Sequence, residues 1–162
     1  MLENTLHWYK GEVFEAKFIL LFGLVTIAFS LIFRYWGTTP YAKALFIPML
    51  VTGLLFAISA GWGIYSNEKK AAAIEQSSQP DTKDFVASEK KRVEDFQWLY
   101  TFSLITSAVC FALALIFLGF TKNIYLHATA IALVWFGIAF MVIDYFSKER
   151  ATIYYDQLMN SL

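Results

Sequence analysis

The stretch FQWLYTFSLITSAVCFALALIFLGFT, residues 96–121, decides the fold, because none of its 26 residues carries a charge. An α-helix needs about 20 mostly apolar residues to cross the roughly 30 Å hydrocarbon core of a bilayer. Inside that core each backbone polar group must be hydrogen-bonded within the protein, and a helix does this with its own residues. The stretch therefore predicts a membrane-spanning helix.

Three further gaps between charged residues predict three more spans. They cover 16, 24 and 21 uncharged residues, at 18–33, 44–67 and 123–143. The shortest gap suffices because the long side chains of Lys17 and Arg34 can reach the lipid headgroups. We therefore expect an all-α integral membrane protein, a single domain with four transmembrane helices in an antiparallel bundle. The expected spans are residues 13–34, 42–66, 96–120 and 124–146.

The composition agrees with this class and excludes several others. Hydrophobic residues make up 58% of the 162 residues and charged residues 16%, against about 45–50% and 25% in soluble domains. The 13 basic and 13 acidic side chains balance, which excludes a basic nucleic-acid-binding module. Cys110 is the only cysteine, so no disulfide scaffold can form within the chain. The expected surroundings are a lipid bilayer, without nucleic acid.

The distribution of basic residues predicts the orientation. If the two termini and the middle loop share one side, that side holds ten of the 13 basic residues, and only Arg34, Lys43 and Lys122 lie on the other. The positive-inside rule then places both termini in the cytoplasm. All 13 acidic residues fall on or near this cytoplasmic side. The outer surface is therefore expected to be cationic.

Helical composition continues beyond three of the spans on the cytoplasmic side. Residues 66–95 read as a charged helical hairpin interrupted at Ser77–Asp81, where Pro80 ends the helix. The fourth helix is expected to continue past Asp144, so helices two, three and four should all extend into the cytoplasm and could meet a soluble partner. At the N-terminus, the spacing of Leu2, Leu6, Tyr9 and Val13 predicts an amphipathic segment lying at the membrane interface.

Small residues mark helix-packing faces. Gly53, Ala57 and Gly61 recur at intervals of four in the second span, a spacing that lets another helix backbone come close. Small residues at 103, 107, 108 and 112 suggest the same for the third span. Such faces can pair within one chain or between subunits, and both alternatives stay open. Pro48 is expected to bend the second span.

Three carboxylates, Glu12, Glu15 and Asp144, lie at the cytoplasmic ends of the first and fourth spans. Acidic residues in membrane helices are functional candidates, because burying their charge in lipid is unfavourable. At the membrane boundary a cation such as Lys148 or Arg150 can neutralise them, and we favour ion pairing over a cation site. The sequence has no Glu-x-x-His or His-Glu-x-x-His motif, so we expect neither a metal nor another cofactor.

His127 lies at the outer end of the fourth span, in a region that also contains Arg34, Lys43 and Tyr125. Aromatic and cationic side chains at this depth commonly form the interfacial belt of membrane helices, and we favour this role for His127. The alternative is an outer cationic patch that attracts anions or a quinone-like headgroup.

Four neutral hydroxyl residues inside the spans complete the candidates: Thr52, Ser59, Ser103 and Ser107. Hydroxyl groups can line a conduction path or a polar seam between helices. The apolar surroundings of Cys110 disfavour its reactive thiolate form, and no catalytic grouping is evident. These features predict a non-enzymatic homo-oligomer of four-helix subunits that forms a channel or a polar seam.

Two alternatives to the homo-oligomer remain open. The chain could be an accessory or scaffold subunit of a larger membrane complex, with nearly all residues serving packing. It could instead be an interfacial metal-dependent enzyme that uses the cytoplasmic-side carboxylates Glu12, Glu15 and Asp144.

Overall fold

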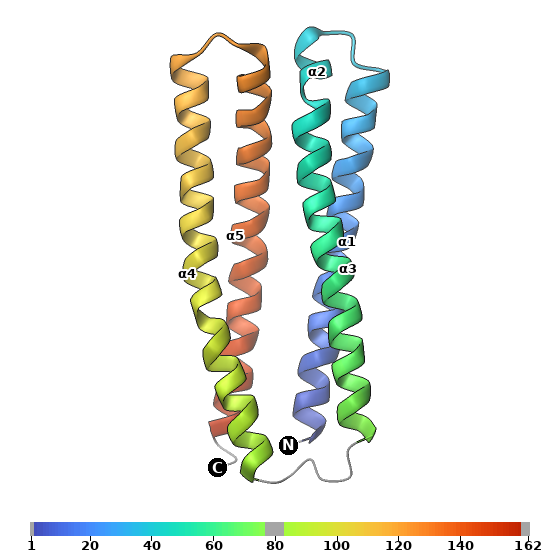
Figure 1. Cartoon of the computed structure of the whole chain (residues 1–162), viewed down its shortest axis with the longest axis vertical. Coiled ribbons are helices and arrows are strands. Elements are labelled where there is room, and N and C mark those ends of the chain that lie inside the picture. The colour runs from blue at the N-terminus through green and yellow to red at the C-terminus, as the bar shows by residue number, and fades with distance from the viewer. Residues whose placement is uncertain (1, 77–82, 160–162) are drawn as a thin grey trace.

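The computed structural model describes residues 2–76 and 83–159, and these residues form helices joined by short turns (Figure 1). The helices are α1 (Leu2–Tyr35), α2 (Pro40–Ala44), α3 (Phe46–Gln76), α4 (Lys83–Phe120) and α5 (Ile124–Met159). Four helical segments are long and apolar enough to cross a membrane: Glu3–Tyr35, Pro40–Gln76, Phe85–Phe120 and Ile124–Met159. The prediction of an all-α antiparallel bundle with four candidate membrane spans is therefore confirmed.

The bundle consists of two helical hairpins, α1 with α3 and α4 with α5 (Figure 1). Their turns, residues 36–39 and 121–123, lie at one end, called here the turn end, and both termini lie at the other, the termini end. Helix α5 also approaches α1, α2 and α3. Within the described residues, the backbone of α4 comes close only to α5. Most of the α4 surface in its apolar part is therefore not covered by this chain.

Glycines set the distance between α1 and α3. A Cβ atom on Gly53 would lie 2.9 Å from the backbone oxygen of Gly23 and 2.9 Å from the backbone nitrogen of Ile27. A Cβ atom on Gly23 would lie 2.7 Å from the backbone nitrogen of Ala57. Two backbones can approach this closely only where small residues face each other. Gly53 and Ala57 thus lie at the contact with α1, whereas Gly61 is exposed, and a Cβ atom there would meet no neighbouring element within 4 Å among the described residues.

The substitution Gly53→Ala is expected to destabilise the α1–α3 pair by about 1–3 kcal/mol, because its methyl group meets backbone that cannot move independently of the helix. The matched control is Gly61→Ala in the same helix, where the space is open and stability should be unchanged or slightly higher. Denaturant titration in detergent, followed by circular dichroism, measures both. Equal stability of the two variants would contradict this account of the packing.

All four long helices run well beyond the expected spans, as α1 begins at Leu2, α3 continues to Gln76, α4 begins at Lys83 and α5 continues to Met159. The break expected at Ser77–Asp81 lies outside the described residues. The helical path is interrupted at Leu45, between α2 and α3. Pro48 has no N–H group to donate to the carbonyl of Ala44 four residues earlier, which accounts for the position of this interruption. The bend expected from Pro48 stays a prediction.

The N-terminal segment differs from the expectation of a helix lying at the interface. It is the first part of the continuous helix α1, and Tyr9 is only 2% exposed. The physical reason is that Trp8 and Tyr9 pack against the arginine side chain of Arg92 from α4. The apolar spacing of this segment therefore reflects packing within the protein.

Candidate functional site

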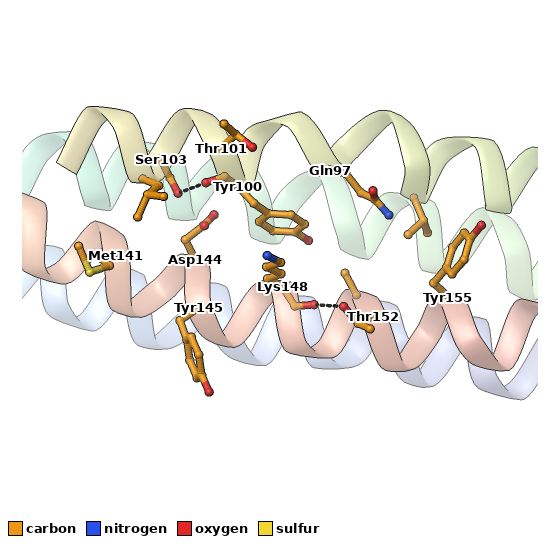
Figure 2. A pocket seen from close by; sticks show the side chains of 13 residues that line it. Gln97, Tyr100, Thr101, Ser103, Met141, Asp144, Tyr145, Lys148, Thr152 and Tyr155 are labelled. Atoms are coloured by element: carbon orange, nitrogen blue, oxygen red, sulfur yellow. Dashed lines mark hydrogen bonds between the residues drawn. The ribbon is translucent and has the colours of Figure 1, made fainter. Parts of the chain in front are cut away.

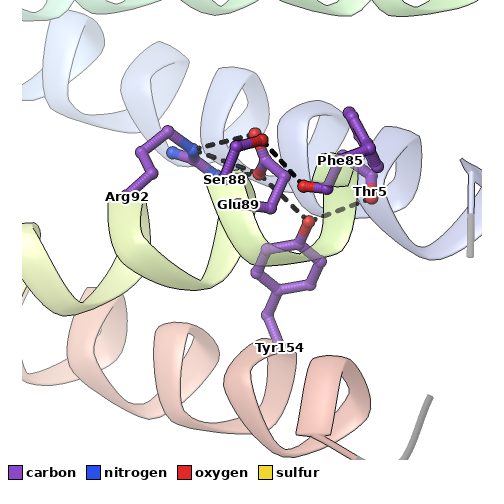
Figure 3. Close-up of polar contacts among 6 residues, drawn as sticks. All are labelled: Thr5, Phe85, Ser88, Glu89, Arg92 and Tyr154. Carbon is purple, nitrogen blue, oxygen red and sulfur yellow. Dashed lines mark hydrogen bonds and ion pairs between the residues drawn. The ribbon is translucent and has the colours of Figure 1, made fainter. Parts of the chain in front are cut away.

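A polar cluster joins α1, α4 and α5 near the termini end, outside the expected spans (Figure 3). Its members, called here the termini-end network, are Thr5, Glu89, Arg92 and Tyr154. The hydroxyl oxygen of Tyr154 lies 2.9 Å from Oγ1 of Thr5 and 3.2 Å from Oε2 of Glu89, to which it donates. Thr5, Glu89 and Tyr154 are all buried. The network thus connects three helices through side chains that exclude water.

The charge of Glu89 is neutralised by Arg92, one turn further along α4. The Arg92 Nη2 atom lies 2.7 Å from Glu89 Oε2, and Nε donates to both carboxylate oxygens at 3.1 and 3.2 Å. The guanidinium group also covers the rings of Trp8, at 4.5 Å, and Tyr9, at 5.2 Å. Such cation–π contacts favour the charged form of arginine in a partly desolvated site. The buried ion pair is therefore well coordinated.

Burial also determines the protonation of the tyrosines in this region. Desolvation is the largest effect that raises the pKa of Tyr154, and the nearby Glu89 carboxylate raises it further. Desolvation likewise raises the pKa of Tyr9 to about 12, although Arg92 acts in the opposite direction. Both hydroxyl groups therefore stay protonated at neutral pH. Tyr154 acts as a hydrogen-bond donor to Glu89 and is unsuited to act as a general base.

A second cluster, called here the Arg150 triad, joins α1 to α5. Arg150 Nη1 lies 2.6 Å from Glu15 Oε2, and Nη2 lies 2.9 Å from Glu12 Oε1. Gly11 leaves room for this guanidinium group, since a Cβ atom there would lie 2.8 Å from Nη2. The two glutamates face one cation, so the triad carries one net negative charge when both are ionised. Ion pairing therefore occupies these two carboxylates.

Asp144 forms no part of the Arg150 triad and lines a cleft of about 480 Å³ between α4 and α5. Figure 2 shows Asp144 and Lys148 on α5, with Tyr100 and Gln97 on α4, around this cleft. At this cleft, the hydroxyl group of Ser103 donates a hydrogen bond to the carbonyl oxygen of Tyr100 at 3.1 Å. The lining of the cleft offers one carboxylate, that of Asp144, and one amine, that of Lys148.

The four candidate hydroxyl residues do not come together around one cavity. Thr52, Ser103 and Ser107 are buried, whereas Ser59 is exposed on α3. Ser59 donates to the carbonyl of Phe56 at 3.1 Å, within its own helix. Ser107 Oγ is buried and has no hydrogen-bond partner among the described residues. Since the backbone of α4 approaches only α5 in the described part of the chain, Ser103 and Ser107 are covered by α5.

His127 stabilises the turn end. Its Nε2 atom lies 2.7 Å from the carbonyl oxygen of Thr121, and Nδ1 lies 3.4 Å from the hydroxyl oxygen of Tyr41. The Tyr41 and His127 rings are stacked, with centroids 6.1 Å apart. Both ring nitrogens therefore face groups of this chain, and His127 connects α2 to the start of α5.

The termini-end network was not predicted from the sequence, although Glu89 and Arg92 are three residues apart and so share a helix face. Nor was a hydrogen bond within the membrane region, where Trp135 Nε1 donates to Thr26 Oγ1 at 3.2 Å. Among the described residues, no group of three or more His, Cys, Asp or Glu side chains could hold a metal ion. A scan of protein-family models, a search of curated proteins and a search of solved structures find no match to this chain.

Proposed function

We propose that this chain is a non-enzymatic membrane protein that assembles with further copies of itself through the outward face of α4. The observation that carries the proposal is a line of exposed small residues on α4, whose backbone comes close only to α5 among the described residues. Thr101, Ala108, Ala112 and Gly119 are all exposed on α4. Because these residues are 7, 4 and 7 positions apart, they lie on one face of a helix with 3.6 residues per turn.

Ala108, Ala112 and Gly119 lie on the side of α4 opposite the residues buried against α5, and Thr101 also lines the cleft between α4 and α5. The residues of α4 that are buried against α5 include Ser103, Ser107, Cys110 and Ala114. The third span therefore has two small-residue faces, of which one is used within the chain. The other contains the pair Ala108 and Ala112, four residues apart, a pattern that allows close approach of a second membrane helix. A self-associating α4 would cover this face.

The burial of the hydroxyl residues inside the chain limits where a conduction path could lie. Thr52, Ser103 and Ser107 are buried inside the chain, so they do not support a pore through one subunit. A channel would have to form between subunits, where the hydroxyl group of Thr101 is exposed on the outward face of α4. We therefore propose assembly as the primary property, with conduction as a property of the assembly.

The test compares Ala108→Leu/Ala112→Leu with the control Ala28→Leu, which changes an exposed alanine of α1. In mild detergent, light scattering coupled to size exclusion should show several chains per particle for the parent protein and for Ala28→Leu. Particles of the double variant should contain one chain each, because the leucine side chains prevent close approach of the helices. A monomeric parent protein, or a double variant that stays assembled, would overturn the proposal.

The accessory-subunit alternative predicts a different result in the same experiment. Purification from the native membrane without crosslinking would then give a foreign chain in fixed ratio, and the protein purified alone would be monomeric. Ion flux into liposomes, measured only for preparations that assemble, tests conduction separately.

A further inference from the structure

The turn end of the molecule carries positive charge that no acidic residue balances. The sequence has no Asp or Glu between Glu15 and Glu68 or between Asp95 and Asp144. Both turns and the adjoining helix ends fall inside these two ranges. Arg34, Lys43 and Lys122 therefore lie at this end without an acidic side chain near them in sequence. By contrast, the ion pairs at Glu12, Glu15 and Glu89 all belong to the half that contains the termini.

Two of these cations line a cleft of about 790 Å³ formed by the end of α1, α2 and the first turns of α3 and α5. Arg34 and Lys43 supply its charge, and Tyr125 and Thr129 of α5 supply hydroxyl groups. The Arg34 guanidinium group lies 5.9 Å from the centre of the Phe46 ring. This contact favours a position of the arginine beside the cleft. The cleft is thus lined by two cations, one of which also contacts an aromatic ring.

The remaining lining is apolar and continues toward the membrane interior. It includes Phe46, Ile47 and Pro48, the first residues of the apolar helix α3. Ile47 is 66% exposed, so its side chain is available to a ligand in the bilayer. Cationic groups therefore lie at the end of the helices, at headgroup depth, and apolar groups lie next to them along the span. A ligand that fits both parts has an anionic headgroup and a hydrocarbon chain.

We propose that this turn-end cleft binds the phosphate headgroup of an anionic phospholipid, with the acyl chain beside Ile47 and Pro48. Arg34 and Lys43 neutralise the phosphate, and basic pockets between membrane helices are suited to such headgroups. The interaction is strengthened because the bilayer interface is less polar than water. Lipid binding at this cleft is separate from assembly through α4, since the lining residues come from α1, α2, α3 and α5.

The test uses native mass spectrometry of the full chain released from detergent, with phosphatidylglycerol, phosphatidylcholine and inorganic phosphate as probes. We expect a preference for phosphatidylglycerol. The variant Arg34→Gln/Lys43→Gln should bind phosphatidylglycerol about 25-fold more weakly. Each basic group near a headgroup contributes about fivefold in affinity, and the variant lacks two of them. The variant Arg34→Lys/Lys43→Arg keeps both charges and should retain binding. Lipids are counted per chain, so the result does not depend on the number of subunits.

Two controls separate this cleft from general attraction between charges. Lys122→Gln removes a turn-end cation that is not part of the cleft lining, and Lys69→Gln/Lys70→Gln removes two exposed cations from α3. Both should keep the preference for phosphatidylglycerol. The proposal is overturned if phosphatidylcholine binds equally well, or if Arg34→Gln/Lys43→Gln binds like the parent protein. Binding of inorganic phosphate as tight as that of phosphatidylglycerol would also overturn it, in favour of a free anion.

Discussion

Arg150→Gln is expected to destabilise the protein by about 2 kcal/mol, between the ranges for breaking an exposed and a buried ion pair. The parent side chain holds Glu12 at 2.9 Å and Glu15 at 2.6 Å. These three side chains are only 17–30% exposed, so water replaces the lost cation poorly. Without Arg150 the two carboxylates repel each other between α1 and α5. The free energy of unfolding in detergent measures the effect.

A second substitution in the same background tests the cause. Arg150→Gln/Glu15→Gln should be more stable than Arg150→Gln alone, because one of the two uncompensated charges is gone. Lys148→Gln is the matched control, since it removes an exposed cation two residues away on the same helix. Its stability should stay within about 0.5 kcal/mol of the parent value. If both single variants behave alike, the Arg150 triad does not hold α1 to α5.

The helices themselves could be predicted from the sequence, because lipid imposes a length and composition on any segment that crosses it. The absence of charge at 96–121 and in three other segments was sufficient for four helices. The pairing of these helices could not be predicted in the same way. The spacing of Gly53 and Ala57 predicted a close helix contact, but nothing in the sequence identified Gly23, 30 residues before Gly53, as the partner.

The small-residue faces show a similar limit. Sequence spacing identified small residues at 103, 107, 108 and 112 of one helix, but these residues belong to two different faces. Ser103 and Ser107 are buried, whereas Ala108 and Ala112 are exposed. Helical periodicity separates the two faces by angle, and only the position of α5 shows which one is used within the chain.

Long-range polar contacts were the least predictable feature. Ion pairing of Glu15 was favoured from the sequence, with several cations as candidates, and the structure selects Arg150. The termini-end network draws its members from three helices, and only Glu89 and Arg92 are near each other in sequence. Thr5 and Tyr154 are 149 positions apart. Their contact depends on how the two hairpins are placed, which no local pattern encodes.

Glu89→Gln should destabilise the protein by about 3 kcal/mol, because it leaves the Arg92 cation, whose side chain is only 22% exposed, without its counter-charge. The amide keeps the shape of the carboxylate, so packing around Tyr154 is preserved. The substitution therefore tests the loss of the negative charge without a change in side-chain volume. Glu89 is 7% exposed, and the matched control Glu94→Gln concerns a carboxylate whose side chain is 47% exposed. The control should lose at most about 1 kcal/mol.

The double variant Glu89→Gln/Arg92→Gln distinguishes a buried charge from a lost hydrogen bond. Removing both charges abolishes the uncompensated cation, so the double variant should be more stable than Glu89→Gln alone. Tyr154→Phe removes the hydroxyl group at 2.9 Å from Thr5 and 3.2 Å from Glu89, with an expected loss of about 1–2 kcal/mol. If Glu89→Gln and the double variant were equally destabilised, the ion pair would matter only as a hydrogen-bonding unit. The attachment of α4 to α1 would then depend on the apolar cluster of Val86, Val93, Tyr154 and Leu158, against which Trp8 of α1 packs.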